Sequence, residues 1–273
     1  MGPSCSFQLL APAESRLTAQ FARSRNDEQL RDHYMASMQR LRGRAYLQDG
    51  AIQPHNLDDE GRFHMSGDED SWHLLLVDEA NEVIGCAKYL VHAGTVPYHR
   101  LKISQSTLAN HPIWGDKVQR AVEADLRRVR EERLHYVEVG GWALAEEWRG
   151  TRAALEILVG SYALGQIWGG AIGSCTATVR HASSSMLRRI GGSSFELSGE
   201  PIPPYEDPHY GCTMELLRFD YRTPSKRFLP LINPLKASLS KCSVLSPASD
   251  TALKPFLDEC KPLLGPLQPA YLT

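Results

Sequence analysis

The sequence predicts an α/β protein with a central, mixed and twisted sheet flanked by helices, and two observations carry that prediction. A strand that begins at residue 137 and a second run at residues 171–179 are suited to buried strands, and the second is almost uncharged and rich in small and β-branched side chains. Between them, residues 151–168 place apolar side chains at helical spacings and end at a Gly-Gly pair suited to a helix C-terminus. Such a helix is expected to pack one face on the sheet.

The remaining elements are predicted from the same periodicities and from turn residues. They are a helix at residues 27–46, a hairpin of strands at 72–77 and 82–90, helices at 114–133 and 180–190, and extended structure at 195–197. The hairpin turn is polar, and the last helix closes on a second Gly-Gly pair.

One domain is expected to hold these elements. A chain of 273 residues that is 42% hydrophobic and 23% charged can bury a large core. We expect an N-terminal segment at residues 1–24, the α/β domain at 25–222, and a Pro-rich C-terminal extension at 223–273, where prolines interrupt short apolar pieces.

Several broad classes are excluded by composition. The net charge of −2 leaves no strongly basic face for nucleic acid. No apolar run reaches transmembrane length and the N-terminus lacks a signal-peptide pattern, so a cytoplasmic protein is expected. The six cysteines are scattered without a Cys-x-x-Cys pair, so no metal is expected.

The turn between the strand that begins at Val137 and the following helix is the most informative segment. Backbone N–H groups that open a helix lack intrahelical partners and lie at the positive end of the helix dipole, so they favour phosphate oxygens. Arg149 and Arg152 add positive charge there. The predicted phosphate-binding residues are Arg149, Gly150, Thr151, Arg152, Ala153 and Ala154. An ordinary strand-to-helix turn with a solvated basic end is the alternative.

This turn resembles the acyl-CoA signature of the GCN5-related N-acetyltransferase (GNAT) superfamily, Gln/Arg-x-x-Gly-x-Gly/Ala. Arg149 takes the first place and Ala154 the last, while Arg152 replaces the middle glycine. The order of elements also resembles that family. The resemblance implies an acetyltransferase-type fold and an acyl-CoA or acyl-phosphopantetheine thioester as acyl donor.

Other motifs resemble a particular group of this superfamily, the acyl-homoserine lactone (autoinducer) synthases and the related N-acyl amino acid synthases. They are Arg42 with Tyr46, the acidic Asp68 and Asp70, the hairpin Lys88 in place of an arginine, and Glu138 at the start of a strand. Gly140-Gly141 stand where autoinducer synthases carry a Ser/Thr-Arg pair, so the match is nearer to the N-acyl amino acid synthases. The resemblance covers residues 25–222.

The resemblance implies transfer of an acyl group, long-chain by this reading, from an acyl-carrier-protein or acyl-CoA thioester to the amine of an amino acid or similar small molecule. Glu138 is the candidate general base, with a carboxylate that merely pairs with a cation as the alternative. Backbone N–H groups of Trp142, Ala143 and Leu144 would polarise the thioester carbonyl. His181 would protonate the leaving thiolate or else help to cap its helix.

Substrate contacts are expected from Arg42, Tyr46, Asp70, Trp72 and Lys88, although buried aromatic residues are often plain core. An acyl carrier protein is a candidate partner for the basic helix that carries Arg120, Arg127, Arg128, Arg130 and Arg133, with a solvated helix as the alternative. Two other functions stay open at this point. They are a short-chain acetyl-CoA N-acetyltransferase and a non-catalytic acyl-thioester-binding module.

Overall fold

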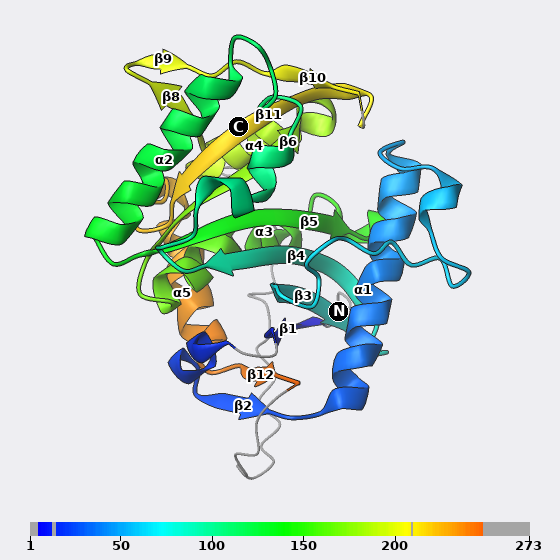
Figure 1. Ribbon diagram of the computed structural model, residues 1–273. Helices are drawn as coiled ribbons and strands as arrows, with labels where there is room; N and C mark the ends of the chain where they lie inside the picture. The colour runs from blue at the N-terminus through cyan, green and yellow to red at the C-terminus, as the bar shows by residue number, and fades with distance from the viewer. Residues whose placement is uncertain (1–4, 13–14, 209, 248–273) are drawn as a thin grey trace. The chain divides into compact units, whose positions relative to one another are not determined.

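A computed structural model describes residues 5–12, 15–208 and 210–247 of the chain (Figure 1). In this part of the chain, ten strands form one mixed sheet with the hydrogen-bonded order β10-β11-β6-β5-β4-β3-β1-β12-β2, and β7 pairs with β11. The β5–β6, β1–β12 and β12–β2 pairs are parallel, and β1–β3, β3–β4 and β6–β11 are antiparallel. The predicted mixed sheet flanked by helices is therefore confirmed.

The described residues fall into two compact units. Unit 1 consists of residues 1–89, 141–167 and 230–273, and unit 2 of residues 90–140 and 168–229, in each case as far as they are described. Strands β4 (Val83–His92) and β5 (His135–Leu144) run through both units.

Unit 1 holds strands from both ends of the chain. Its other elements are β1 (Cys5–Leu10), η1 (Arg16–Gln20), β2 (Arg23–Arg25), α1 (Glu28–Gln48), η2 (Pro54–Asn56), β3 (Trp72–Asp78), η5 (Glu146–Trp148), α3 (Arg152–Ile167), β12 (Ser243–Leu245) and all but the first residue of α5 (Leu229–Leu239). The Asp27 side chain caps α1 by accepting from the N–H of Leu30 at 3.1 Å.

Helices α1 and α3 pack on opposite faces of the unit 1 strands. Tyr34 and Met38 of α1 share a buried cluster with Leu75 of β3. On the other face, Gly160 of α3 lies so close to Leu74 that an added Cβ would stand 2.4 Å from Leu74 Cδ2. Adjacent strand residues point to opposite faces, so Leu74 packs against α3 and Leu75 packs against α1. This packing fixes the helix that carries Arg42 and Tyr46 and the helix that begins at Arg152.

Unit 2 is built around β6 and β11, with α2 packed against them. Its elements are η3 (Tyr98–Arg100), η4 (Lys102–Gln105), α2 (Gly115–Glu131), β6 (Ala171–Thr178), η6 (Arg180–Ala182), α4 (Ser183–Ile190), β7 (Ser193–Ser194), β8 (Glu196–Leu197), β9 (Glu200–Pro201), β10 (Tyr205–Asp207), β11 (Cys212–Asp220) and η7 (Lys226–Phe228). Val122 and Leu126 of α2 pack with Ile172 and Leu216 in one buried cluster.

The predicted core elements are present, and their boundaries differ from the predicted ones by a few residues. The helix expected from residue 180 begins at Ser183, because residues 180–182 form a 3-10 turn and Ala182 has a left-handed backbone with φ of 59°. Sequence reasoning did not foresee β1, β2, β12 or α5. The domain limits at 24/25 and 222/223 stay predictions, and residues 248–273 of the expected tail lie outside the described residues.

Candidate functional site

Three ionisable side chains of unit 1 meet in a buried group that we call the charge cluster. They are Arg42 of α1, Asp68 of the loop before β3, and Lys88 of β4. Arg42 is fully buried and donates from Nη1 to Asp68 Oδ1 at 3.0 Å, while its Nη2 bonds Asp68 Oδ2. The Lys88 Nζ lies 3.3 Å from Asp68 Oδ1 and donates to the Ser66 carbonyl at 2.9 Å. Two residues predicted to contact substrate thus converge on one carboxylate.

The charge cluster carries more positive than negative charge. Burial alone would raise the pKa of Asp68, but the Arg42 guanidinium and then the Lys88 ammonium outweigh it and hold this pKa well below its usual range. Buried His73 donates from Nε2 to the Asp68 carbonyl at 2.8 Å, and burial lowers its pKa to about 4. With His73 neutral, two cations face one carboxylate, so an anionic group of a ligand would be stabilised here.

Gly141 of β5 lies close against the charge cluster. An added Cβ would stand 3.1 Å from Lys88 Cβ and 3.2 Å from Arg42 Nη1, and the backbone φ is +61°. Next to it, the Tyr46 hydroxyl donates to the Trp142 carbonyl at 3.3 Å. Only glycine adopts this conformation without cost and without crowding the two cations.

Replacing Gly141 by alanine is expected to lower the free energy of unfolding by about 1–2 kcal/mol, because a left-handed non-glycine residue is strained and its Cβ would press on Lys88. Urea unfolding measures this loss. Gly140→Ala is the matched control, since a Cβ at Gly140 meets nothing within 4 Å. Equal effects of the two substitutions would show that the space beside the charge cluster is unimportant.

The last residues of β5 present alternate N–H groups to opposite edges of the strand. The Ala145 N–H donates to the Ile84 carbonyl of β4 at 2.8 Å, and the Ala143 N–H bonds the buried Cys86 sulfur on the same strand. Because strand N–H groups alternate in direction, those of Trp142 and Leu144 point to the other edge. The prediction that N–H groups of Trp142, Ala143 and Leu144 polarise a carbonyl therefore narrows to Trp142 and Leu144, since the Ala143 N–H is bonded to Cys86.

The predicted phosphate-binding turn follows directly in unit 1. Gly150 has φ of +74° with open space where a side chain would be, and the Thr151 hydroxyl accepts from the Ala154 N–H at 3.3 Å. Arg152 Nε instead contacts Oε1 of fully buried Glu156 at 3.0 Å. Arg149 is exposed and has no ion-pair partner among the described residues. The cation free to meet an anion at this turn is therefore Arg149.

Glu138 lies in unit 2, with both carboxylate oxygens engaged. Its Oε2 is 2.9 Å from Nε2 of His92, and its Oε1 accepts from the Ile103 N–H at 3.1 Å. Glu138 is 8% exposed, and the His92 side chain is 14% exposed. His92 was not predicted, because a lone histidine at the end of a strand matches no motif. Only its contact with Glu138 identifies it, and that contact can be seen in the folded structure but not in the sequence.

The other predicted site residues lie outside these groups. Trp72 is buried and stacked on Phe21 with ring centroids 5.3 Å apart. Asp70 is exposed, two residues from the buried Asp68. His181 lies in η6, and its side chain is outside the described part of the structure.

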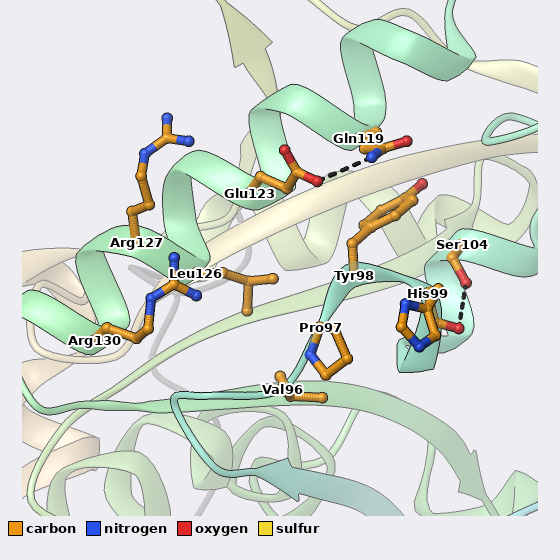
Figure 2. Close-up of a pocket in the computed structure, with 10 residues that line it drawn as sticks. All are labelled: Val96, Pro97, Tyr98, His99, Ser104, Gln119, Glu123, Leu126, Arg127 and Arg130. Atoms are coloured by element: carbon orange, nitrogen blue, oxygen red, sulfur yellow. Dashed lines mark hydrogen bonds between the residues drawn. The ribbon is translucent and has the colours of Figure 1, made fainter.

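Unit 2 also has a surface groove of about 530 Å³ between α2 and the segment that contains η3 and η4 (Figure 2). The lining residues are Val96, Pro97, Tyr98, His99, Ser104, Gln119, Glu123, Leu126, Arg127 and Arg130. Arg127 and Arg130 are exposed and have no ion-pair partner among the described residues, whereas Arg128 contacts Glu132 and Asp220. The basic helix predicted to dock a carrier protein is thus partly neutralised.

Two kinds of feature are absent from the described residues. No helix there is long and apolar enough to cross a membrane. No group of three or more His, Cys, Asp or Glu side chains there is arranged to hold a metal ion.

No protein-family model matches the chain, and no curated protein matches it. Several solved structures do match it. The CoA-dependent acyl-homoserine lactone synthase BjaI, solved with SAM and isopentyl-CoA, has a TM-score of 0.53 and 13% identity, over 90% of this chain and 96% of that one. Its structure with MTA gives 0.52 and 14%, over the same shares.

FeeM, an N-acyl amino acid synthase from uncultured soil microbes, has a TM-score of 0.48 and 10% identity, over 81% of this chain and 92% of that one. Sequence identities this low show a shared fold and nothing more. The GNAT-type fold expected from the sequence is confirmed, and this chain shares the fold of an acyl-homoserine lactone synthase.

Proposed function

We propose that the protein is an N-acyltransferase that moves an acyl group from an acyl-CoA or acyl-carrier-protein thioester to the amine of an amino acid or a similar small molecule. One observation carries this proposal. Within unit 1, the end of β5 joins a buried, net-positive charge cluster beside Gly141 to the start of α3 beside the exposed Arg149. A single short strand segment thus links a place for an acidic acceptor to a place for a phosphate-bearing donor.

The reaction requires an amine, hydrogen-bond donors for the developing oxyanion, and a fixed geometry of the two reactants. The charge cluster would hold the acceptor's carboxylate, which balances the excess positive charge. The N–H groups of Trp142 and Leu144 would stabilise the oxyanion that forms when the amine attacks the thioester carbonyl. Fixing both reactants along β5 lowers the entropic part of the barrier.

The donor is proposed to bind through its phosphate arm. The N–H groups of Arg152 and Ala153, the open Gly150 and the exposed Arg149 side chain would contact the phosphate oxygens, since the predicted Ala154 N–H already donates to the Thr151 hydroxyl. The structural neighbour BjaI was solved with isopentyl-CoA, which supports a thioester donor for this fold. A long acyl chain remains the preferred substrate in this proposal.

The test is to incubate the purified protein with acyl-CoA and acyl-carrier-protein thioesters of increasing chain length and a pool of amino acids and amines. Thiol release and new amide masses are then measured together. An amide that needs the protein supports the transferase and identifies both substrates. Acetyl transfer alone would favour a short-chain enzyme, and thioester binding without turnover would favour a binding module.

Arg149→Ala is expected to raise KM for acyl-CoA about tenfold, which corresponds to the loss of one charge-assisted contact of about 1.4 kcal/mol. Steady-state kinetics with acyl-CoA as the varied substrate measure it. Arg127→Ala is the control, because Arg127 is likewise exposed and unpaired among the described residues but lies on α2. A KM that rises equally in both variants would remove Arg149 from the donor site.

A further inference from the structure

We propose that the groove of unit 2 binds a small phosphorylated molecule of the nucleotide class, with its phosphate on Arg127 and Arg130 of α2. This goes beyond the proposed acyl transfer, which rests on residues of unit 1, and does not depend on it. The groove lies wholly within unit 2, since its lining residues fall in segments 96–104 and 119–130. Its volume of about 530 Å³ is in the range of small-molecule sites.

The wall that α2 contributes is a stripe of side chains along one face of the helix. Gln119, Glu123, Arg127 and Arg130 line the groove and follow one another at intervals of three or four residues. The helix rises about 16 Å between the first and the last of them. Figure 2 shows the two arginines at one end of this stripe and Gln119 at the other, with Glu123 between them. The groove therefore has a basic end and a mixed polar end.

The basic end holds two cations without partners. Arg127 and Arg130 are exposed, and no hydrogen bond or ion pair holds either guanidinium within the described residues. Side chains three residues apart on a helix are neighbours, so one anion can contact both. A phosphate monoester carries nearly two negative charges at pH 7 and has three acceptor oxygens, so it matches two guanidinium groups better than a singly charged carboxylate does.

The mixed polar end offers hydrogen-bond acceptors. Glu123 Oε1 accepts from Gln119 Nε2 at 2.9 Å, which leaves Oε2 without a hydrogen bond among the described residues. The Ser104 hydroxyl donates its hydrogen to the Leu101 carbonyl at 2.7 Å, so its oxygen is left to accept. A ligand must therefore present hydroxyl or amino hydrogens at this end.

Tyr98, on the wall opposite α2, adds an unsatisfied hydroxyl. This hydroxyl is buried and has no hydrogen-bond partner among the described residues, although its ring packs against the apolar cluster of unit 2. Burial, and to a smaller extent the charge of Glu123, raises the pKa of Tyr98, so the hydroxyl keeps its hydrogen. Figure 2 shows it at the Gln119 end, and the exposed Gln119 side chain can turn aside for a ligand.

A nucleotide has the groups that match these features. Its phosphate would contact the two arginines, its ribose hydroxyls would donate to Glu123 and Ser104, and its planar base would lie on apolar surface. Val96, Pro97 and Leu126 supply that surface together with the Tyr98 ring. A phosphate alone would leave the mixed polar end unused, and a nucleoside alone would leave the arginines unpaired.

The first test is calorimetric titration of the full chain with adenosine monophosphate (AMP), inorganic phosphate and adenosine. AMP is expected to bind at least tenfold more tightly than either fragment. Arg127→Ala and Arg130→Ala are each expected to weaken AMP binding about tenfold. Arg120→Ala is the matched control and is expected to leave it unchanged, because Arg120 is an exposed arginine of the same helix outside the groove.

Two further variants separate binding from a structural role. Glu123→Gln is expected to weaken AMP binding about tenfold without weakening phosphate binding, since it removes an acceptor and a negative charge together. Tyr98→Phe is expected to weaken AMP binding about fivefold without lowering the urea midpoint of unfolding, because the hydroxyl has no hydrogen bond to lose in the free protein.

The proposal is overturned if AMP binds no more tightly than phosphate, or if Arg120→Ala weakens AMP binding as much as Arg127→Ala does. Loss of AMP binding in Arg149→Ala would assign the nucleotide to the turn before α3 and would overturn it too. None of these titrations contains an acyl donor or an amine acceptor. Failure of acyl transfer by the wild type would therefore overturn the proposed function and leave this result as it stands.

Discussion

Asp68→Asn is expected to lower the free energy of unfolding by about 3–5 kcal/mol, the usual cost of removing one partner from a buried ion pair. The fully buried Arg42 and the nearly buried Lys88 would lose the carboxylate that both contact. Their charges would remain in an environment that water cannot reach, which explains the size of the effect. Chemical unfolding at pH 7 measures it.

Asp70→Asn provides the matched control, because the same change is made two residues along the same loop at an exposed position. It is expected to change the free energy of unfolding by less than about 0.5 kcal/mol. If both substitutions cost the same, the buried pairing of Asp68 would not be what stabilises unit 1. The comparison also decides which of the two aspartates identified in the sequence matters.

The free energy of unfolding is also expected to fall by about 3 kcal/mol as the pH is lowered from 6.5 to about 4, through His73 alone. Burial lowers the pKa of His73 in the folded protein, so between these values the unfolded chain binds a proton that the folded chain does not. The stability is therefore fully present above pH 6.5 and is lost as the pH falls. The depressed pKa of Asp68 acts in the same direction only below its unfolded value of 3.8.

Unfolding curves at a series of pH values measure this slope. His73→Gln is expected to flatten it between pH 6.5 and 4, whatever the variant's stability at pH 7. His55→Gln is the control, because His55 is exposed and has no ion-pair partner among the described residues. A slope that survives in His73→Gln would mean that another group takes up the proton.

Elements with a clear period were predictable from the sequence, and short strands that pair over long distances were not. The apolar spacing of α3 and the polar turn between β3 and β4 are local signals that a window of about ten residues contains. By contrast, β12 has three residues, and its place beside β1 depends on a partner far away in the chain. No local pattern encodes that partner.

Some residues of the candidate site could likewise be predicted from the sequence, and others could not. Arg42, Lys88 and Glu138 were chosen by their type and position, and each proved to have charged or hydrogen-bonded partners. The sequence could not show which aspartate would be buried. Asp68 and Asp70 lie two residues apart in the same irregular loop, and only the path of that loop buries one and exposes the other. The pairing of His92 with Glu138 was missed because it joins residues of two different strands.

The parallel strand β12 is hydrogen-bonded between β1 and β2, so a segment from late in the chain separates two from its start. During synthesis, β1 can pair with β3 as soon as the hairpin emerges, but its other edge stays open until residues 243–245 leave the ribosome. An open edge of Cys5–Leu10, most of whose side chains are buried in the finished sheet, can recruit strands from other chains. The late arrival of three residues thus sets how long the nascent protein is exposed to misassembly.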